Sequence, residues 1–177
     1  MKLQLAYYGD PILRKKGAPI ESINDEIRQL VKDMIDTIIE HNGIGLAAPQ
    51  VYRSLALFIT SVPIEQPDGN WLPGELRVFI NPKILSIAEE KSTRSEGCLS
   101  VPTIYAEVNR PIRIQIQATD LEGNDFEEEF SDLAARCIMH ENDHINGVLF
   151  IDRVQGKARK ELEPKLKEIK KKYNPKK

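Results

Sequence analysis

The sequence has few of the residues that most often build covalent or metal-linked frameworks. Its 177 residues include two cysteines, three histidines and one tryptophan. No apolar run approaches the about 20 residues that a membrane-spanning helix needs. The first segment, MKLQLAYYGD, is too polar for a secretory signal and too poor in arginine for a transit peptide. We therefore expect a cytoplasmic protein with reduced thiols, which bind metals or do redox chemistry there more often than they pair.

The charges nearly cancel, but they are unevenly distributed. Lys and Arg number 25 and Asp and Glu number 27, so the formal net charge is −2. This balance argues against wholesale nucleic-acid binding, and we expect neither DNA nor a membrane as a partner. Residues 156–177, however, hold ten Lys or Arg against three Glu. We therefore divide the chain into a main domain, residues 1–155, and a basic C-terminal helix or tail, residues 156–177.

Hydrophobic periodicity predicts three helices. Residues 24–42 carry an apolar stripe with i, i+3, i+4, i+7 spacing, which is typical of an amphipathic helix. Asn24 can cap its first turn, and Asn42 followed by glycine can end it in the left-handed conformation. A second helix is predicted over residues 131–146. The basic tail predicts a third, interrupted or started by Pro164.

The middle of the chain predicts short, mostly antiparallel strands. Apolar and polar residues alternate over residues 112–117, and a turn leads back into residues 126–130, which predicts a hairpin. Residues 78–85 look extended, with Pro82 favouring a sheet edge or a bend. Residues 61–76 read as a loop or ragged hairpin. Helices flanking such strands indicate the α+β class.

The strongest chemical signal is the pattern H-E-x-x-H, formed by His140, Glu141 and His144 in the second predicted helix. Residues four apart share one helix face, so both imidazoles can reach one metal ion. The neighbouring Glu141 can lean into the same cleft and take a proton from a metal-bound water without ligating. The apolar residues around the motif predict a buried helix, where these polar groups would need a partner.

The third metal ligand is less clear from the residues alone. An extended zinc-protease pattern continues through Gly147, but Phe150 stands where its third histidine would be. His41 is better explained as the C-terminal partner of the first helix, and the glutamates of the tail as a solvated face. Two thiols remain. Spacing favours Cys98, in a tight loop between extended segments, over Cys137, without excluding either.

Three segments together resemble the peptide deformylase family, in the family's order and at similar spacing. They are GIGLAAPQ (residues 43–50), EGCLS (residues 96–100) and HENDH (residues 140–144). The likeness covers about residues 1–155, which would form the catalytic domain, with a tail like that of long-tailed bacterial members. The resemblance implies antiparallel sheets packed around a central HExxH helix, with an N-terminal amphipathic helix and a C-terminal helix. It also implies removal of the formyl group from the N-terminal formylmethionine of new polypeptides.

The resemblance implies that Cys98, His140 and His144 bind one divalent metal ion, with water in the fourth position. The expected ion in the cell is Fe(II), and zinc, nickel or cobalt can occupy such a site. Glu141 would accept the proton of the attacking water and later return it to the departing amine.

Further family positions imply how the substrate is held. The Gln50 amide and the Leu99 backbone N–H would donate to the oxygen that gains negative charge. Main-chain groups of Ile44 and Gly45 would pair with an extended peptide. The methionine pocket would be lined by Ile44, Leu133 and Cys137.

Other family positions are supporting or divergent. Glu96 and Arg110 match an acid and a base that we expect to pair and to brace the Cys98 loop. Tyr52, Tyr105 and Arg136 depart from common family residues. We expect these departures to affect peptide affinity and side-chain preference rather than the metal chemistry.

Two other functions compete with deformylation. A zinc endopeptidase would need a third ligand after His144, and a non-catalytic ribosome-binding module would be expected to lose Gln50, Glu141 or a ligand. The expected substrates are N-formylmethionyl nascent peptides. The basic tail adds the ribosome as an expected partner, through phosphate contacts that weaken as salt rises.

Overall fold

The computed structural model describes residues 1–175, so the last two residues of the predicted basic tail, 176 and 177, lie outside the described residues. Within them the chain is of the α+β class, with antiparallel sheets, as predicted. The α-helices are α1 (Asp25–Glu40), α2 (Asp132–Ile145) and α3 (Gly156–Tyr173). Short 3-10 helices are η1 (Pro11–Arg14), η2 (Ala48–Val51) and η3 (Phe150–Arg153). No helix in the described part of the chain is long and apolar enough to cross a membrane.

The strands form a five-stranded sheet and two hairpins. The sheet has the order β1 (Gly45–Ala47), β2 (Leu57–Ser61), β5 (Leu76–Ile87), β8 (Arg113–Thr119), β9 (Asp125–Ser131), with every neighbouring pair antiparallel. The hairpins are β3 (Ile64–Glu65) with β4 (Trp71–Leu72), and β6 (Lys91–Cys98) with β7 (Val101–Pro111). The β8–β9 hairpin and the ragged β3–β4 hairpin were both predicted.

Pro82 lies within β5, past the residues that pair with β2, since that pairing covers Leu76 to Ile80. Of the two predicted possibilities, an edge or a bend, the bend is present. The pairing of β5 with β8 shifts register between Ile80 and Lys83, which places the proline in an irregularity of the ladder. A proline lacks the N–H that regular pairing requires, so a bulge is where an interior strand can accept it.

The first predicted helix forms with the predicted caps. The Asn24 side chain accepts a hydrogen bond from the Ile27 backbone N–H at 3.0 Å, and Asn42 adopts a φ of 53° just after the helix. The apolar stripe of α1 is buried against β1 and β2, in a cluster with Leu46, Leu57 and Ile59. Helix α1 therefore supports β1, the edge strand that lies within the GIGLAAPQ segment.

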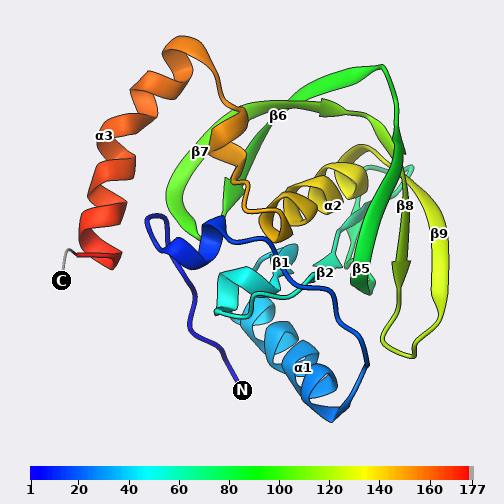
Figure 1. Cartoon of the computed structure of the whole chain (residues 1–177). Coiled ribbons are helices and arrows are strands. Elements are labelled where there is room, and N and C mark those ends of the chain that lie inside the picture. Colours follow the sequence, from blue (N-terminus) through cyan, green and yellow to red (C-terminus); the bar gives the residue numbers. More distant parts are fainter. Residues whose placement is uncertain (176–177) are drawn as a thin grey trace.

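Helix α2 lies between hairpin β6–β7 and the five-stranded sheet (Figure 1). Ala135, Ile138 and Met139 pack in one cluster with Phe58 and Phe79, whose rings stack with centroids 4.7 Å apart. The opposite side of α2 carries buried polar residues that face hairpin β6–β7. The two halves of the strand framework thus cover chemically different faces of one helix.

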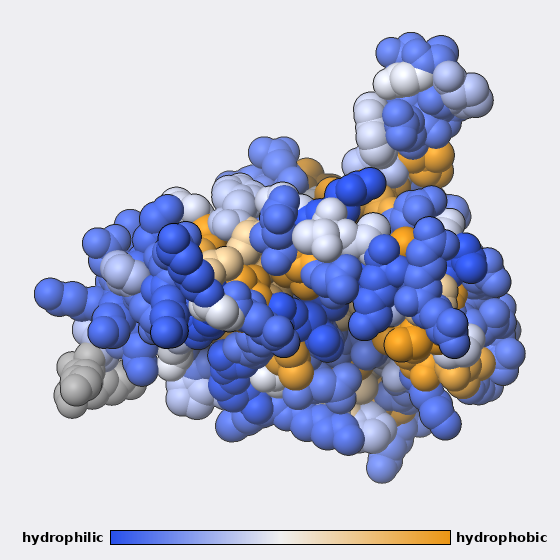
Figure 2. Space-filling view, turned by 90° about the horizontal axis from the view of Figure 1, so that it is seen from above, coloured by the Kyte–Doolittle hydropathy of each residue, from blue (hydrophilic) through white to orange (hydrophobic). Residues whose placement is uncertain are grey.

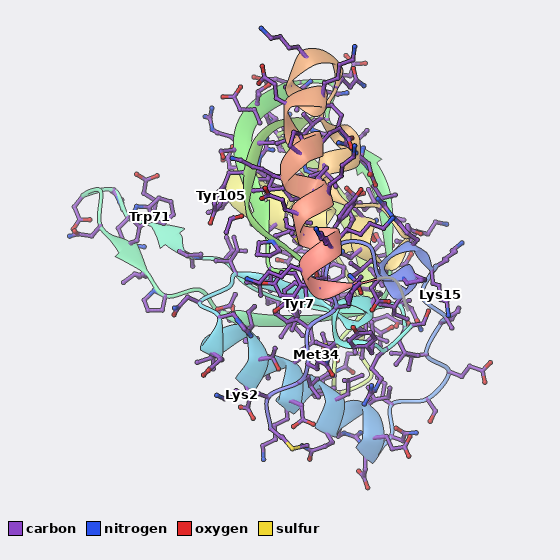
Figure 3. The ribbon with its side chains drawn as sticks, turned by 90° about the vertical axis from the view of Figure 1, so that its left-hand side faces the viewer. Lys2, Tyr7, Lys15, Met34, Trp71 and Tyr105 are labelled. Carbon is purple, nitrogen blue, oxygen red and sulfur yellow. The ribbon has the colours of Figure 1, made fainter. Side chains whose placement is uncertain are left out.

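Helix α3 packs along β7 and is anchored at its C-terminal end. Leu166 and Ile169 are buried, and the Tyr173 ring stacks on Tyr7 with centroids 3.9 Å apart. Asn174 donates to the carbonyls of Tyr7 and Tyr8 at 3.0 and 2.9 Å. The outer surface of α3, at the left in Figure 2, is mainly hydrophilic. Figure 3 shows the lower end of α3 beside Tyr7.

Pro164 lies inside α3, and the helix continues through it. The prediction that this proline starts or interrupts the helix was therefore wrong. Pro164 lies on the solvent-exposed side of α3.

Candidate metal centre and active site

The structure brings Cys98, His140 and His144 together from two distant parts of the chain. Cys98 ends β6, at a register irregularity after Gly97, and both histidines project from α2. One ligand atom from each lies within 4.8 Å of the other two. The Cys98 sulfur is 3.3 Å from His144 Nε2. This geometry selects Cys98 from the two thiols that spacing alone left open.

Cys137 has a different position. It is buried, and its sulfur donates weakly to the Ile44 carbonyl at 3.6 Å. Burial raises the pKa of the Cys137 thiol well above its ordinary value. A neutral thiol in this place is a packing residue rather than a metal ligand.

The His140 ring is oriented by Glu96. His140 Nδ1 and Glu96 Oε1 are 2.9 Å apart, which leaves Nε2 as the ring atom for a metal ion. Arg110 donates to both oxygens of Glu96, at 2.6 and 2.9 Å, and to Asp143 at 3.0 Å. The predicted pair of Glu96 with Arg110 is therefore confirmed.

The electrostatics around the two histidines differ. Burial and the positive charge of His140 hold the pKa of His144 well below its ordinary value, so its ring is neutral. Burial also opposes charging of His140. Hydrogen bonds with Cys98 and Glu96, and the negative charge of Glu141, outweigh that effect and raise its pKa. Groups that favour a proton at this position also favour a metal cation.

These residues fit a divalent transition metal ion. One thiolate and two imidazoles are a ligand set that zinc and iron accept, and three protein ligands leave a coordination position for water or substrate. A carboxylate behind the first histidine is the usual way in which such a ring is held. The arrangement therefore has the donor types, the proximity and the support that a metal site requires.

Glu141 lies beside this cluster and against β1. It is 4% exposed, and in the part of the chain that the structure describes its Oε1 atom has no hydrogen-bond partner. Burial raises the pKa of Glu141 to about 7. A carboxylate with a free oxygen and a pKa near neutrality is suited to accept and return a proton.

The absence of a side chain at Gly45 leaves space for the Glu141 carboxylate. A Cβ atom on residue 45 would lie 2.5 Å from Glu141 Oε2 and 2.9 Å from the Cys137 sulfur. Both distances are shorter than van der Waals contact allows. A larger residue would have to displace the Glu141 carboxylate, so a close side-chain approach, and not the backbone angles, favours glycine here.

Gln50 reaches the metal cluster from the other side. It belongs to η2, and its Oε1 accepts from the Ala47 backbone N–H at 2.9 Å. Its Nε2 donates to Ser100 Oγ at 3.1 Å and to the Cys98 sulfur at 3.5 Å. The amide nitrogen is therefore fixed next to Cys98, and Ser100 of the EGCLS segment, which was not assigned a role from sequence, helps to hold it.

A groove of about 560 Å³ joins these groups. Nine of the ten predicted site residues line it, namely Ile44, Gly45, Gln50, Cys98, Leu99, Leu133, Cys137, His140 and Glu141. His144 is 1% exposed and lies beneath it. His41, Tyr7 and Tyr173 also line the groove and were not predicted to do so. The two tyrosines could not be found from sequence because their stacking joins opposite ends of the chain.

The three divergent residues have separate surroundings. Tyr52 has a φ of 63° and donates to Asp10 at 2.8 Å; burial and this bond raise its pKa to about 12. Tyr105 is 73% exposed at the groove, with its ring over Gly97, on the same side of the molecule as Trp71 (Figure 3).

The third divergent residue, Arg136, has a buried and charged partner. Arg136 lines the groove, but its guanidinium is buried and bonded to Glu96 at 2.7 Å. Since Glu96 holds His140, Arg136 is one residue away from a ligand of the candidate metal site. Arg136 contacts none of the three ligand residues, so the expectation that it does not touch the metal chemistry stays a prediction.

Comparison with known proteins agrees with this geometry. The sequence model of the polypeptide deformylase family matches residues 2–160. A peptide deformylase of Acinetobacter baumannii (strain SDF) is 44% identical over 167 residues, covering 94% of this chain and 91% of that protein. One from Rhodopseudomonas palustris (strain BisB18) is 46% identical over 145 residues, covering 82% and 81%.

Solved structures are similar over the same extent. A plant peptide deformylase superposes with a TM-score of 0.88 at 38% identity, covering 97% of this chain and 90% of that one. A class I type b peptide deformylase from Acinetobacter baumannii, bound to Met-Ala-Ser, has a TM-score of 0.81 at 34% identity, covering 87% and 99%. On this sequence match, the chain belongs to the polypeptide deformylase family.

Proposed function

We propose that this protein is a metal-dependent hydrolase that removes the formyl group from N-terminal formylmethionine and releases formate. The observation that carries the proposal is that three metal-ligand atoms meet at the floor of a groove beside a buried Glu141 oxygen, which has no hydrogen-bond partner among the described residues. Family membership supports it. The substrates would be N-formylmethionyl nascent peptides.

Cys98, His140 and His144 would hold the ion. We favour Fe(II) in the cell, and zinc, nickel or cobalt suit the same sulfur and nitrogen donors. When bound, such an ion acts as a Lewis acid and lowers the pKa of water. Helix α2 is, in this proposal, the central support of the catalytic domain, and amphipathic α1 buttresses the strand beside it.

Glu141 would move the proton. As water attacks the formyl carbon, one Glu141 oxygen takes the water proton. The C–N bond then breaks, and Glu141 gives that proton to the departing amine, so formate and a free amino terminus result. A buried carboxylate with a pKa near 7 can perform both transfers.

Gln50 and Leu99 would stabilise the intermediate charge. As the formyl carbon becomes tetrahedral, its oxygen gains negative charge, which the Gln50 Nε2–H and the Leu99 backbone N–H would neutralise by donating hydrogen bonds. Gln50 is suited to this role because Ser100 and Ala47 hold its amide in one orientation. A preorganised donor loses little energy in reorientation during the reaction.

The groove would select the peptide. Main-chain groups of Ile44 and Gly45, at the free edge of the five-stranded sheet, can pair with an extended chain. Ile44, Leu133 and Cys137 would line the methionine pocket, because all three face the groove. A formyl carbon bears only hydrogen, so it can enter a site too narrow for an ordinary peptide carbonyl.

The catalytic domain would span residues 1–155, and the basic tail, residues 156–177, would contact ribosomal RNA in the cytosol. Deleting the tail would also remove Tyr173 from the groove. Charge reversal at the exposed Lys160, Lys165 and Lys167 is therefore the cleaner test. Binding to pelleted ribosomes should fall in the triple variant and with added salt, while deformylation of a short peptide is unchanged. Unchanged pelleting would refute this role.

The central test is formate release from a formyl-Met peptide, with Glu141→Gln beside the parent. Loss of the proton-transfer group should lower kcat about 10²–10⁴-fold, while the metal content stays the same. A variant with the parent's rate would exclude Glu141 as the base. Casein cleavage without formate release would instead indicate the endopeptidase, and ribosome binding without either activity would indicate the non-catalytic module.

A further inference from the structure

We propose that Arg136 is a positioning residue for the metal centre, which fixes the Glu96 carboxylate and, through it, the ring of His140. The inference rests on the proposed metal-binding role of His140. It assigns a function to a buried cation that belongs to none of the three family motifs.

The Arg136 guanidinium is held in one orientation by four hydrogen bonds to hairpin β6–β7. Nη1 donates to Glu96 Oε2 at 2.7 Å and to the Val108 carbonyl at 2.8 Å. Nη2 donates to the Ser92 carbonyl at 2.8 Å and to Ser92 Oγ at 3.3 Å. Ser92 lies on β6 and Val108 on β7, so one side chain of α2 is fastened to both strands of the hairpin that carries Cys98.

The Glu96 carboxylate needs this second cation. Its Oε2 accepts from Arg110 Nε at 2.6 Å and from Arg136 at 2.7 Å. Its Oε1 accepts from Arg110 Nη2 at 2.9 Å and faces His140 Nδ1 at 2.9 Å. The two arginines thus hold the plane of the carboxylate, and that plane determines the direction of the bond to the histidine ring.

Arg110 and Arg136 connect Glu96 to different parts of the fold. Arg110 Nη1 also donates to Asp143 at 3.0 Å, and Asp143 is held by Arg153 at 2.6 and 2.7 Å. Two other bonds of Arg136 end on backbone carbonyls of the paired strands β6 and β7, and one ends on Ser92 Oγ. Glu96 lies on β6 and Arg110 on β7, so their own pair stays within the hairpin. Arg136 is therefore a contact that fixes the Glu96 carboxylate to α2, the helix that carries His140.

The spacing on α2 supports the same conclusion. Arg136 precedes His140 by four residues, so the two side chains share one face of the helix. Glu96 contacts both of them, at opposite oxygens. A Glu96 carboxylate placed in this way links the separation of α2 and β6 to the orientation of the His140 ring. Strand β6 also ends at Cys98, the third ligand residue.

The test measures metal release rather than turnover. The full-length protein, loaded with Co²⁺ or Zn²⁺, is mixed with an excess of a chelator, and the release rate is compared among the parent, Arg136→Met, Arg136→Lys and Arg153→Met. Arg136→Met should release the ion about 10–100-fold faster, as expected when support behind a ligand is lost. Lysine cannot reach Glu96, Val108 and Ser92 together, so Arg136→Lys should be intermediate. Arg153→Met removes a cation of the same network that does not touch Glu96, and it should stay within about twofold of the parent.

A second readout reports on the ring itself. In the Zn²⁺-loaded protein, the proton on His140 Nδ1 should give an NMR resonance that moves in both Arg136 variants and stays in place in Arg153→Met. Parent-like release and an unmoved resonance in folded Arg136→Lys would overturn the inference, even if Arg136→Met fails to fold. Equal acceleration by Arg153→Met would overturn it as well. A parent protein that binds neither ion would instead refute the proposed function.

Discussion

The two faces of helix α2 are both buried, yet they are built from opposite kinds of residues. One face packs Ala135, Ile138 and Met139 against phenylalanines of the five-stranded sheet. The other presents Arg136 and His140 to hairpin β6–β7, where both contact the carboxylate of Glu96. The same helix thus joins an apolar layer to a buried network of ions.

The difference teaches which property each face provides. Apolar burial stabilises in proportion to area and tolerates small changes of shape. A buried ion network offsets a large desolvation cost and contributes little net stability, but its hydrogen bonds have fixed directions. We infer that the apolar face provides the stability of the fold, and that the polar face provides the geometry of the metal centre.

The largest expected effect comes from removing one cation of the network. Arg110 is 2% exposed and bonds Glu96 and Asp143. Arg110→Met should lower the free energy of unfolding by about 3 kcal/mol, because two carboxylates each lose one of their two arginine partners. Urea unfolding followed by circular dichroism measures the change, and metal content measured on the same samples should fall too.

Arg77→Met is the matched control for this variant. Arg77 pairs with Glu128 at 2.7 Å, but the pair is partly exposed, and such pairs contribute about 0–1 kcal/mol. If Arg110→Met were no more destabilising than Arg77→Met, the contrast between the two faces would be lost.

Lowering the pH should reduce the stability that the polar face of α2 contributes before it affects the apolar face. Burial raises the pKa of Glu96, but hydrogen bonds from His140 and Arg110 and the charge of Arg110 outweigh it and hold the pKa at about 2. The stabilisation from its ionised form is therefore complete above the unfolded-state pKa of 4.5 and is lost as pH falls toward about 2. Between pH 6 and pH 3 this group should account for a loss on the order of 2 kcal/mol.

Urea unfolding at several pH values tests this expectation by comparing the parent with Glu96→Gln. The loss of stability on acidification should be smaller in Glu96→Gln, whereas Glu161→Gln, at an exposed glutamate of α3, should match the parent. Identical pH dependence in all three proteins would show that Glu96 does not titrate with folding.

The smallest expected effect lies on the apolar face. Ile138 is 1% exposed, and Ile138→Val removes one methylene group. The free energy of unfolding should fall by about 0.5–1.5 kcal/mol. The metal release rate should be unchanged, because the loss is one of packing and not of ligand direction. Accelerated metal release in Ile138→Val would show that the two faces are not independent.

Local patterns in the sequence were sufficient for the parts of the fold that depend on neighbouring residues. The cap at Asn24, the alternation in β8 and the pairing of Glu96 with Arg110 were all predicted and are present. The motif histidines and Cys98 meet as expected. These features follow from helical periodicity, strand alternation and the family's motifs.

The remaining features depend on contacts between distant segments. The role of Arg136 requires β6, β7 and α2 to meet, although its i+4 relation to His140 was a signal that could have been used. The stacking of Tyr173 on Tyr7 joins the two ends of the chain. The choice between an edge and a bend at Pro82 depends on the irregular pairing of β5 with β8, which one strand alone cannot reveal.

Gly45 has a consequence for engineering. A methyl group on this residue, at the β1 wall of the groove, would displace the Glu141 carboxylate. A library intended to change peptide selectivity should leave this wall as it is and diversify the opposite rim. Tyr105 stands free of the core there and can be exchanged without disturbing the acid–base group.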